Sequence, residues 1–184
     1  MRYFFAFLAA VALIILVFIL IMRGFSGGDR SKIQTLLTDY ARTETVMRMQ
    51  INGPVTADQT HRYLVISVGR NQSTIDIYQG YGKDILKTQS YAGSEEGYRT
   101  FLRALQLQGY TKGNADPAKA EFAGECPLGR TYVFEVVTGS STVQQYWSGS
   151  CGGGTFGGSD KVVRQLFRAQ IPDFNKLTAG LGLQ

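Results

Sequence analysis

The stretch HRYLVISVGRNQSTIDIYQG, residues 61–80, decides the fold. Apolar residues recur at every second position on both sides of GRNQ, which is typical of two strands joined by a tight turn. A turn centred on residues 71–72 predicts the cross-strand pairs Val68–Ile75, Ile66–Ile77 and Leu64–Gln79. This pattern predicts an antiparallel hairpin with one buried face.

Other stretches with strand character lie on both sides of this hairpin. TVMRMQI (45–51) alternates in the same way, and ILKTQSY (85–91) is a plausible fourth strand. RTYVFEVV (130–137) and TVQQYWSG (142–149) surround TGSS and predict a second hairpin, in which Trp147 stands opposite Tyr132. The sequence therefore predicts a mainly antiparallel sheet.

Three segments have helical periodicity. Ser94 is a suitable N-cap for a helix that ends at Gly109, and Ser159 for a last helix limited by Pro172. The residues expected on buried helix faces are Ile33, Leu36, Leu37 and Tyr40; Tyr98, Phe101, Leu102 and Leu105; and Val162, Val163, Leu166 and Phe167. Amphipathic helices packed on an antiparallel sheet predict an α+β fold.

An uncharged run, Tyr3–Met22, precedes this domain. A helix of its 20 residues would span about 30 Å, the thickness of a bilayer core. The run is longer than the apolar part of a cleaved signal peptide, and no cleavage motif follows it. We expect an N-terminal transmembrane helix that stays attached as a single-pass signal anchor (1–23), a linker (24–29) and one domain (30–184).

The two cysteines, Cys126 and Cys151, flank the second hairpin. Folding that hairpin about its turn brings them nearly opposite each other at its open end, which predicts a disulfide bond. Two buried free thiols are the alternative. A zinc site would have only these cysteines and His61, the one histidine of the chain, and is therefore a weak ligand set.

Two signals disagree about the side of the membrane on which the domain lies. Arg23, Arg30 and Lys32 follow the apolar run and only Arg2 precedes it, which favours a cytoplasmic domain. A disulfide favours an oxidising compartment. We give the cysteines more weight and expect a domain outside the cytoplasm, with a cytoplasm-facing domain as the alternative.

The loop SGSCGGGTFGGSDK (148–161) contains a G-x-G-x-x-G pattern at Gly152, Gly154 and Gly157. A dinucleotide site needs that pattern inside a parallel strand–helix–strand unit, whereas the preceding strand here belongs to an antiparallel hairpin. We expect the glycines to let the chain leave the disulfide and turn into the last helix, and we expect no cofactor.

Charge and motifs restrict the function classes. Residues 24–184 carry a net charge of +3 that is scattered along the chain, which does not favour nucleic acid as a partner. The sequence contains no catalytic serine, zinc-protease or similar motif, so neither a catalytic residue nor a metal site is predicted. His61 is expected to be a surface residue rather than a general base.

Aromatic residues form the remaining signal. They gather near the third and fourth strands and on the second hairpin: Tyr78, Tyr81, Tyr91, Tyr132, Tyr146 and Trp147. Core packing explains such residues, and so does an exposed surface that binds a peptide or a glycan. We expect a non-enzymatic envelope domain that binds or scaffolds another protein or glycan. An envelope hydrolase with an unrecognised carboxylate or serine site is the alternative.

Overall fold

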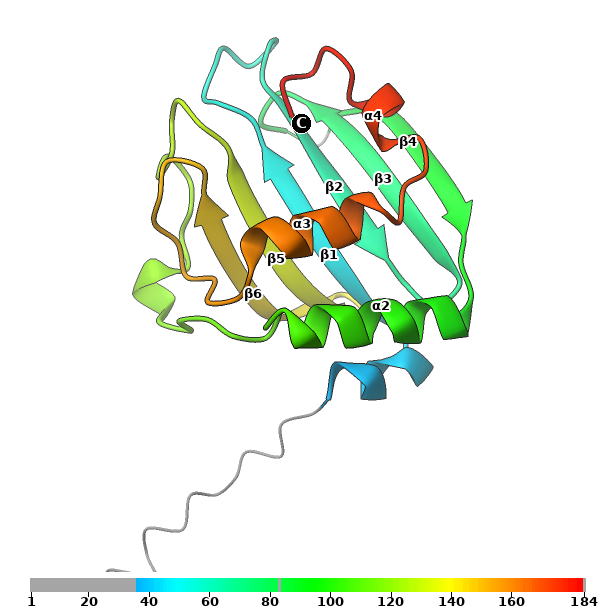
Figure 1. Ribbon diagram of the computed structural model, residues 1–184. Coiled ribbons are helices and arrows are strands. Elements are labelled where there is room, and N and C mark those ends of the chain that lie inside the picture. Colours follow the sequence, from blue (N-terminus) through cyan, green and yellow to red (C-terminus); the bar gives the residue numbers. More distant parts are fainter. Residues whose placement is uncertain (1–35, 83, 184) are drawn as a thin grey trace, which may run out of the picture. The chain divides into compact units, whose positions relative to one another are not determined.

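Six antiparallel strands form the centre of the domain (Figure 1). The computed structural model describes residues 36–82 and 84–183, and its sheet has the order β4-β3-β2-β1-β5-β6. The strands are β1 (Thr45–Asn52), β2 (Arg62–Val68), β3 (Gln72–Gln79), β4 (Asp84–Ala92), β5 (Thr131–Thr138) and β6 (Ser141–Gly149). The predicted α+β fold with a mainly antiparallel sheet is confirmed.

Helices pack on one face of this sheet (Figure 1). They are η1 (Leu37–Arg42), α2 (Glu95–Leu107), α3 (Asp160–Arg168) and α4 (Phe174–Leu177), while the short η2 (Pro117–Lys119) belongs to the loop after α2 and contributes no residue to the core. In Figure 1, α3 crosses the face of the sheet, while α2 and η1 lie at the end where β1 begins. The loop between β1 and β2 lies at the opposite end of the sheet.

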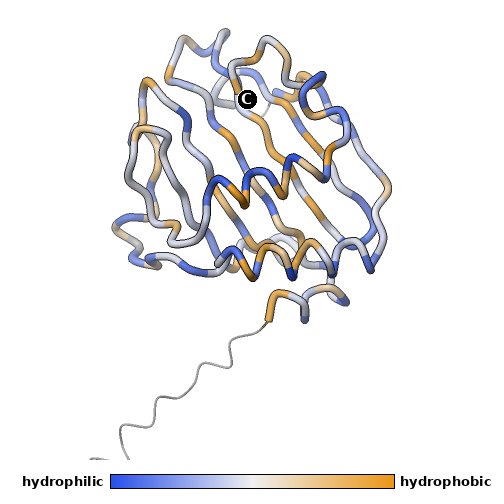
Figure 2. The backbone as a smooth tube through the Cα atoms, viewed as in Figure 1, coloured by the Kyte–Doolittle hydropathy of each residue, from blue (hydrophilic) through white to orange (hydrophobic). Residues whose placement is uncertain are grey.

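The core lies between the sheet and the three α-helices of the described chain. Met47, Met49 and Ile51 of β1 and Phe167 of α3 are fully buried there, and Tyr98 of α2 is buried beside them. The strands and helices alternate between apolar and polar positions (Figure 2). Alternate residues of each strand therefore point away from these helices, to what we call the second face of the sheet. Among them are Arg48, Gln50, Tyr63, Asp76, Tyr78 and Glu135.

The first hairpin has the predicted strands but a different register. Ile66 pairs with Ile75 and Leu64 with Ile77, so each partner lies two residues earlier than predicted. The turn closes with a hydrogen bond from the Gly69 N–H to the Gln72 carbonyl, 2.9 Å long. Since a shift of two residues preserves the side-chain alternation, the predicted buried face was still correct.

The second hairpin contains a bulge that the sequence analysis missed. Val137 pairs with Thr142 and Val136 with Gln144, so the pairing shifts by one residue between these pairs. Trp147 therefore lies opposite Val133, and the predicted pairing with Tyr132 was wrong. Trp147 and Val133 lie on the second face, whereas Tyr132 belongs to the core.

The predicted helices are largely confirmed. The Ser94 hydroxyl accepts a hydrogen bond from the Gly97 N–H, and Gly109 has a φ of 73° just after α2. Ser159 makes no side-chain capping bond, which corrects the prediction; its N–H instead bonds to the Gln108 carbonyl. Val162 of α3 is exposed, so the expectation that it lies on the buried helix face was wrong.

The first described helix differs in type from the prediction. η1 is a 3-10 helix with three residues per turn, so Leu37 and Tyr40 share its inner face. Leu36 is therefore exposed rather than buried.

The expected transmembrane helix, Tyr3–Met22, lies outside the described residues, as do the expected linker and Ile33. Within the part of the chain that the structure describes, no helix is long and apolar enough to cross a membrane.

Candidate functional site

The two edge strands of the sheet, β4 and β6, have different surroundings. Every residue of β4 except Tyr91 is exposed, and no strand of the described chain pairs with its outer side. A nine-residue edge strand presents main-chain N–H and C=O groups to any chain that approaches it. β4 is therefore a candidate surface for binding.

A bulge near the start of β4 brings two apolar side chains to the surface. Tyr78 pairs with Ile85 and Ile77 pairs with Lys87, so Leu86 is the extra residue. Ile85 is 57% and Leu86 51% exposed. A bulge twists the strand and redirects its side chains. Two neighbouring aliphatic residues thus face solvent at one end of the edge strand.

Tyr81, in the turn before β4, is 54% exposed but held in place on several sides. Its ring stacks on His61, with 4.1 Å between the ring centroids. Its hydroxyl donates to the Thr56 carbonyl at 2.8 Å and accepts from the Thr56 N–H at 3.1 Å. Its own N–H donates to the Asp58 carboxylate at 2.9 Å. The loop between β1 and β2 thus fixes an exposed aromatic ring.

His61 is 5% exposed, so the expectation of a surface histidine was wrong. The Tyr81 ring covers it, and its Nδ1 lies 3.1 Å from the Pro54 carbonyl oxygen, which can accept a hydrogen bond. His61 therefore supports the Tyr81 ring and does not face solvent as a general base would.

A second pair of stacked rings lies beside this one on the second face of the sheet. Tyr63 and Tyr78 are direct cross-strand partners, with ring centroids 4.4 Å apart and planes at 2°. Burial raises the pKa of both hydroxyls, and the nearby Asp84 and Asp76 carboxylates raise the pKa of Tyr63 and Tyr78 respectively. Both phenols therefore stay protonated at neutral pH, and the Tyr63 hydroxyl donates to the Gly82 carbonyl at 2.7 Å.

We call Val55, Tyr81, Ile85 and Leu86 the β4 patch. All four side chains are about half exposed. The bonds between Thr56 and Tyr81 hold the Val55 loop against the turn that precedes β4. Since exposed apolar residues that lie near one another are more informative than single ones, the β4 patch is a candidate interaction site.

Three of the predicted surface aromatics are buried instead. Tyr132 lies in the core under the Arg164 guanidinium, 4.1 Å from its ring centroid, and Tyr146 is also buried. Trp147 is covered by the loop after α2, where its indole N–H donates to the Lys119 carbonyl at 2.8 Å. These three rings stabilise the fold and offer no exposed binding surface.

Of the remaining predicted aromatics, Tyr91 packs against the core at the far end of β4. Only Tyr78 and Tyr81 lie near each other at one end of the sheet, joined by the unpredicted Tyr63 and His61. The correct hairpin register would have revealed the Tyr63–Tyr78 pair. The stacking of Tyr81 on His61 joins two turns, and no local sequence pattern indicates it.

The β6 edge, in contrast, is partly covered. The Trp147 carbonyl accepts hydrogen bonds from the Thr155 and Phe156 N–H groups at 2.8 and 2.9 Å, and Gly154 forms a bridge with Ser148. Residues 150–159, between β6 and α3, which we call the glycine loop, thus bond to main-chain groups that an edge strand would otherwise present to solvent.

A disulfide bond between Cys126 and Cys151 closes this part of the molecule, as predicted. The two Cα atoms are 5.9 Å apart. Gly152, Gly153 and Gly154 follow with φ values of 93°, 79° and 132°, which side chains rarely permit. The glycines therefore allow the chain to fold back from the disulfide onto β6.

Four surface hollows of the described chain contain few acidic groups. Each is lined by at most one carboxylate, contributed by Asp39, Glu44 or Glu96. None of these four hollows therefore contains the pair of carboxylates that hydrolysis by an acid and a base would need. Residues 36–82 and 84–183 also contain no cluster of three metal-ligating side chains.

Comparison with protein-family models, with curated proteins and with solved structures finds no match for this chain. Its function is therefore inferred from its own residues and their geometry.

Proposed function

We propose that this chain is a single-pass, membrane-anchored binding domain that lies outside the cytoplasm, and that its β4 edge binds another protein of the cell envelope by strand addition. The observation that carries the proposal is the open β4 edge with the β4 patch at its start. In strand addition the edge supplies main-chain hydrogen bonds, and neighbouring side chains supply specificity.

The composition of the patch favours a protein partner over a glycan. Ile85 and Leu86 are aliphatic, and burying them against apolar side chains of a partner contributes about 25 cal/mol per Å². Tyr81 is already held by Thr56 and His61, so it loses little conformational freedom on binding. Such a fixed aromatic residue is a typical hot spot.

The anchor and the location rest on two further features. Tyr3–Met22 has the length and composition of a membrane-spanning helix. The Cys126–Cys151 disulfide is typical of an oxidising compartment. Together they support a domain tethered to the outer side of the membrane, where its partner would be another envelope component.

Photo-crosslinking of the full chain in its native membrane tests the partner. Benzoylphenylalanine replaces Ile85 in β4 or, as a matched control, Val143 in β6; these residues are 57% and 56% exposed. We expect a discrete protein adduct from position 85 alone. Tyr81→Ala should reduce that adduct about tenfold or more, because hot-spot truncations cost about 2 kcal/mol.

Three results would contradict the proposed partner: equal adducts from both positions, no adduct from position 85, or an adduct that glycosidases remove. The last result would indicate a glycan. Far-ultraviolet circular dichroism of each variant checks that a missing adduct does not reflect unfolding.

The location is tested with a membrane-impermeant maleimide and the Val143→Cys variant. If the domain lies outside the cytoplasm, the maleimide should label the variant as fully in intact cells, or in cells whose outer envelope is permeabilised, as it does in lysed cells. Labelling that requires lysis of the inner membrane would place the domain in the cytoplasm.

A further inference from the structure

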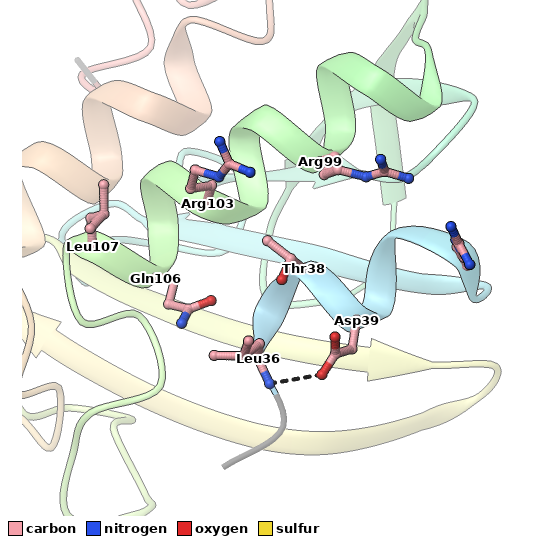
Figure 3. A pocket seen from close by; sticks show the side chains of 8 residues that line it. Leu36, Thr38, Asp39, Arg99, Arg103, Gln106 and Leu107 are labelled. Carbon is pink, nitrogen blue, oxygen red and sulfur yellow. Dashed lines mark hydrogen bonds between the residues drawn. The ribbon is translucent and has the colours of Figure 1, made fainter.

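A groove lies between η1 and α2, at the end of the sheet far from the β4 patch (Figures 1 and 3). Its volume is about 690 Å³. The lining residues that matter here are Leu36, Asp39, Arg42, Arg99, Arg103 and Leu107. Figure 3 shows that side chains from both elements surround it.

The groove is basic. Among its described lining residues Asp39 is the one carboxylate, and it accepts a hydrogen bond from the Leu36 N–H at 3.1 Å. Arg99 pairs with Glu95 of α2 at 2.8 Å. Arg42 and Arg103 form no ion pair with any described residue, and both are exposed. Two guanidinium groups are therefore available to an anion.

Apolar side chains accompany these arginines. Leu36 is 49% and Leu107 78% exposed, and both line the groove. Exposed leucine beside unpaired arginine is typical of surfaces that lie in the interfacial region of a bilayer. Leucine can enter the acyl boundary there while the guanidinium groups bind phosphate.

The chain outside the described residues indicates which surface is within reach. Thirteen residues, 23–35, separate the end of the apolar run from Leu36, and they include Arg23, Arg30 and Lys32. A chain of that length reaches at most about 45 Å even when fully extended. If Tyr3–Met22 anchors the chain, the first residues of the domain therefore always lie within that distance of the membrane surface.

We infer that the η1–α2 groove binds the phosphate headgroups of anionic lipids in the membrane that carries the anchor. This inference rests on the proposed membrane anchor. Arg42 and Arg103 contact lipid phosphate, and Leu36 and Leu107 enter the interface beside them. The contact would turn the η1–α2 end of the domain toward the bilayer and leave the β4 patch available to a partner.

The test uses the full chain reconstituted into phosphatidylcholine vesicles with or without phosphatidylglycerol. A fluorophore on Gln106→Cys reports energy transfer to a headgroup-labelled lipid. We expect transfer to increase at least about twofold with phosphatidylglycerol and to fall again in high salt, because headgroup contacts are screened. Free inorganic phosphate at millimolar concentration should not replace this effect.

Charge-reversal variants identify the residues. Arg42→Glu with Arg103→Glu should abolish the dependence on phosphatidylglycerol. Lys161→Glu with Lys176→Glu changes the charge equally at exposed positions elsewhere and should leave it intact. Thermal unfolding checks that both double variants are folded.

The outcomes separate the two proposals. A chain that alkaline carbonate removes from the vesicles has no membrane anchor, and both proposals fail. A chain that remains inserted but whose label ignores phosphatidylglycerol, or responds equally in both double variants, overturns the lipid inference alone. Competition by free phosphate would indicate a soluble anion site and would also overturn it.

Discussion

The two edges of the sheet differ in how their main-chain groups are used. At β6, the glycine loop bonds to the Trp147 carbonyl, the loop after α2 covers the indole, and a disulfide lies nearby. At β4, no described strand covers the edge, and Ile85 and Leu86 face solvent. The chain itself partly covers the β6 edge, which we call the closed edge, whereas no described strand pairs with the outer side of β4, the open edge.

The open edge also carries features that limit uncontrolled pairing. The bulge at Leu86 twists the start of β4, and Lys87 follows it as an exposed charge. Bulges and edge lysines discourage edge-to-edge aggregation. Under the proposed function, a partner would have to match both a twisted strand and the β4 patch, and the edge would therefore be selective.

The largest expected effect comes from the closed edge. Trp147→Ala should lower the free energy of unfolding by about 4 kcal/mol, because it removes a buried ring and leaves the Lys119 carbonyl without its donor. Ile85→Ala in the open edge should change it by less than about 1 kcal/mol. Urea unfolding of both variants measures the contrast; equal losses would show that the edges do not differ.

Breaking the disulfide is the next test of the closed edge. Cys126→Ser should cost about 3.5 kcal/mol in the chain-entropy account of a loop of this length, and Cys151→Ser should cost a similar amount. The double variant should lose little more, since either change already opens the loop. Unfolding curves of all three variants decide the point. Additive losses would mean that the thiols contribute separately.

The glycine loop offers a smaller and more local test. Gly154→Ala should cost about 2 kcal/mol, because Gly154 has a φ of 132° and an added Cβ would lie 2.8 Å from the Ser148 Cα. Gly152→Ala has a φ of 93° but open space around the Cβ, so it should cost about 1 kcal/mol. Thermal denaturation compares the two variants, and the reverse order would contradict the role of Gly154 in covering the β6 edge.

Much of the fold could be predicted from side-chain periodicity. The alternation in β1 and the stripe of α2 identified the buried faces, because period and burial are directly linked. Register was harder: Ile66 could pair with Ile75 or Ile77 without changing the buried face. The bulge in the second hairpin, which places Trp147 opposite Val133, has no clear signal in the sequence, and the indole of Trp147 bonds to Lys119 in a loop that is distant along the chain.

The candidate site was less accessible to such reasoning. Aromatic content drew attention to Tyr78 and Tyr81, but also to Tyr132 and Tyr146, which pack inside. The sequence pattern around a tyrosine is the same whether its ring packs in the core or lies on a binding surface. What distinguishes Tyr81 is a set of hydrogen bonds and a stacked histidine from a separate loop, and these arise only from the tertiary fold.

Hydrogen–deuterium exchange across the two edges tests the central claim most directly. The full chain is compared in native membranes and after purification in detergent, with peptides from Asp84–Ala92 and Ser141–Gly149 followed separately. If a partner strand pairs with β4, its amides should exchange about tenfold or more slowly in native membranes, while β6 stays unchanged. Identical exchange of β4 in both states, or slowing confined to β6, would contradict the account.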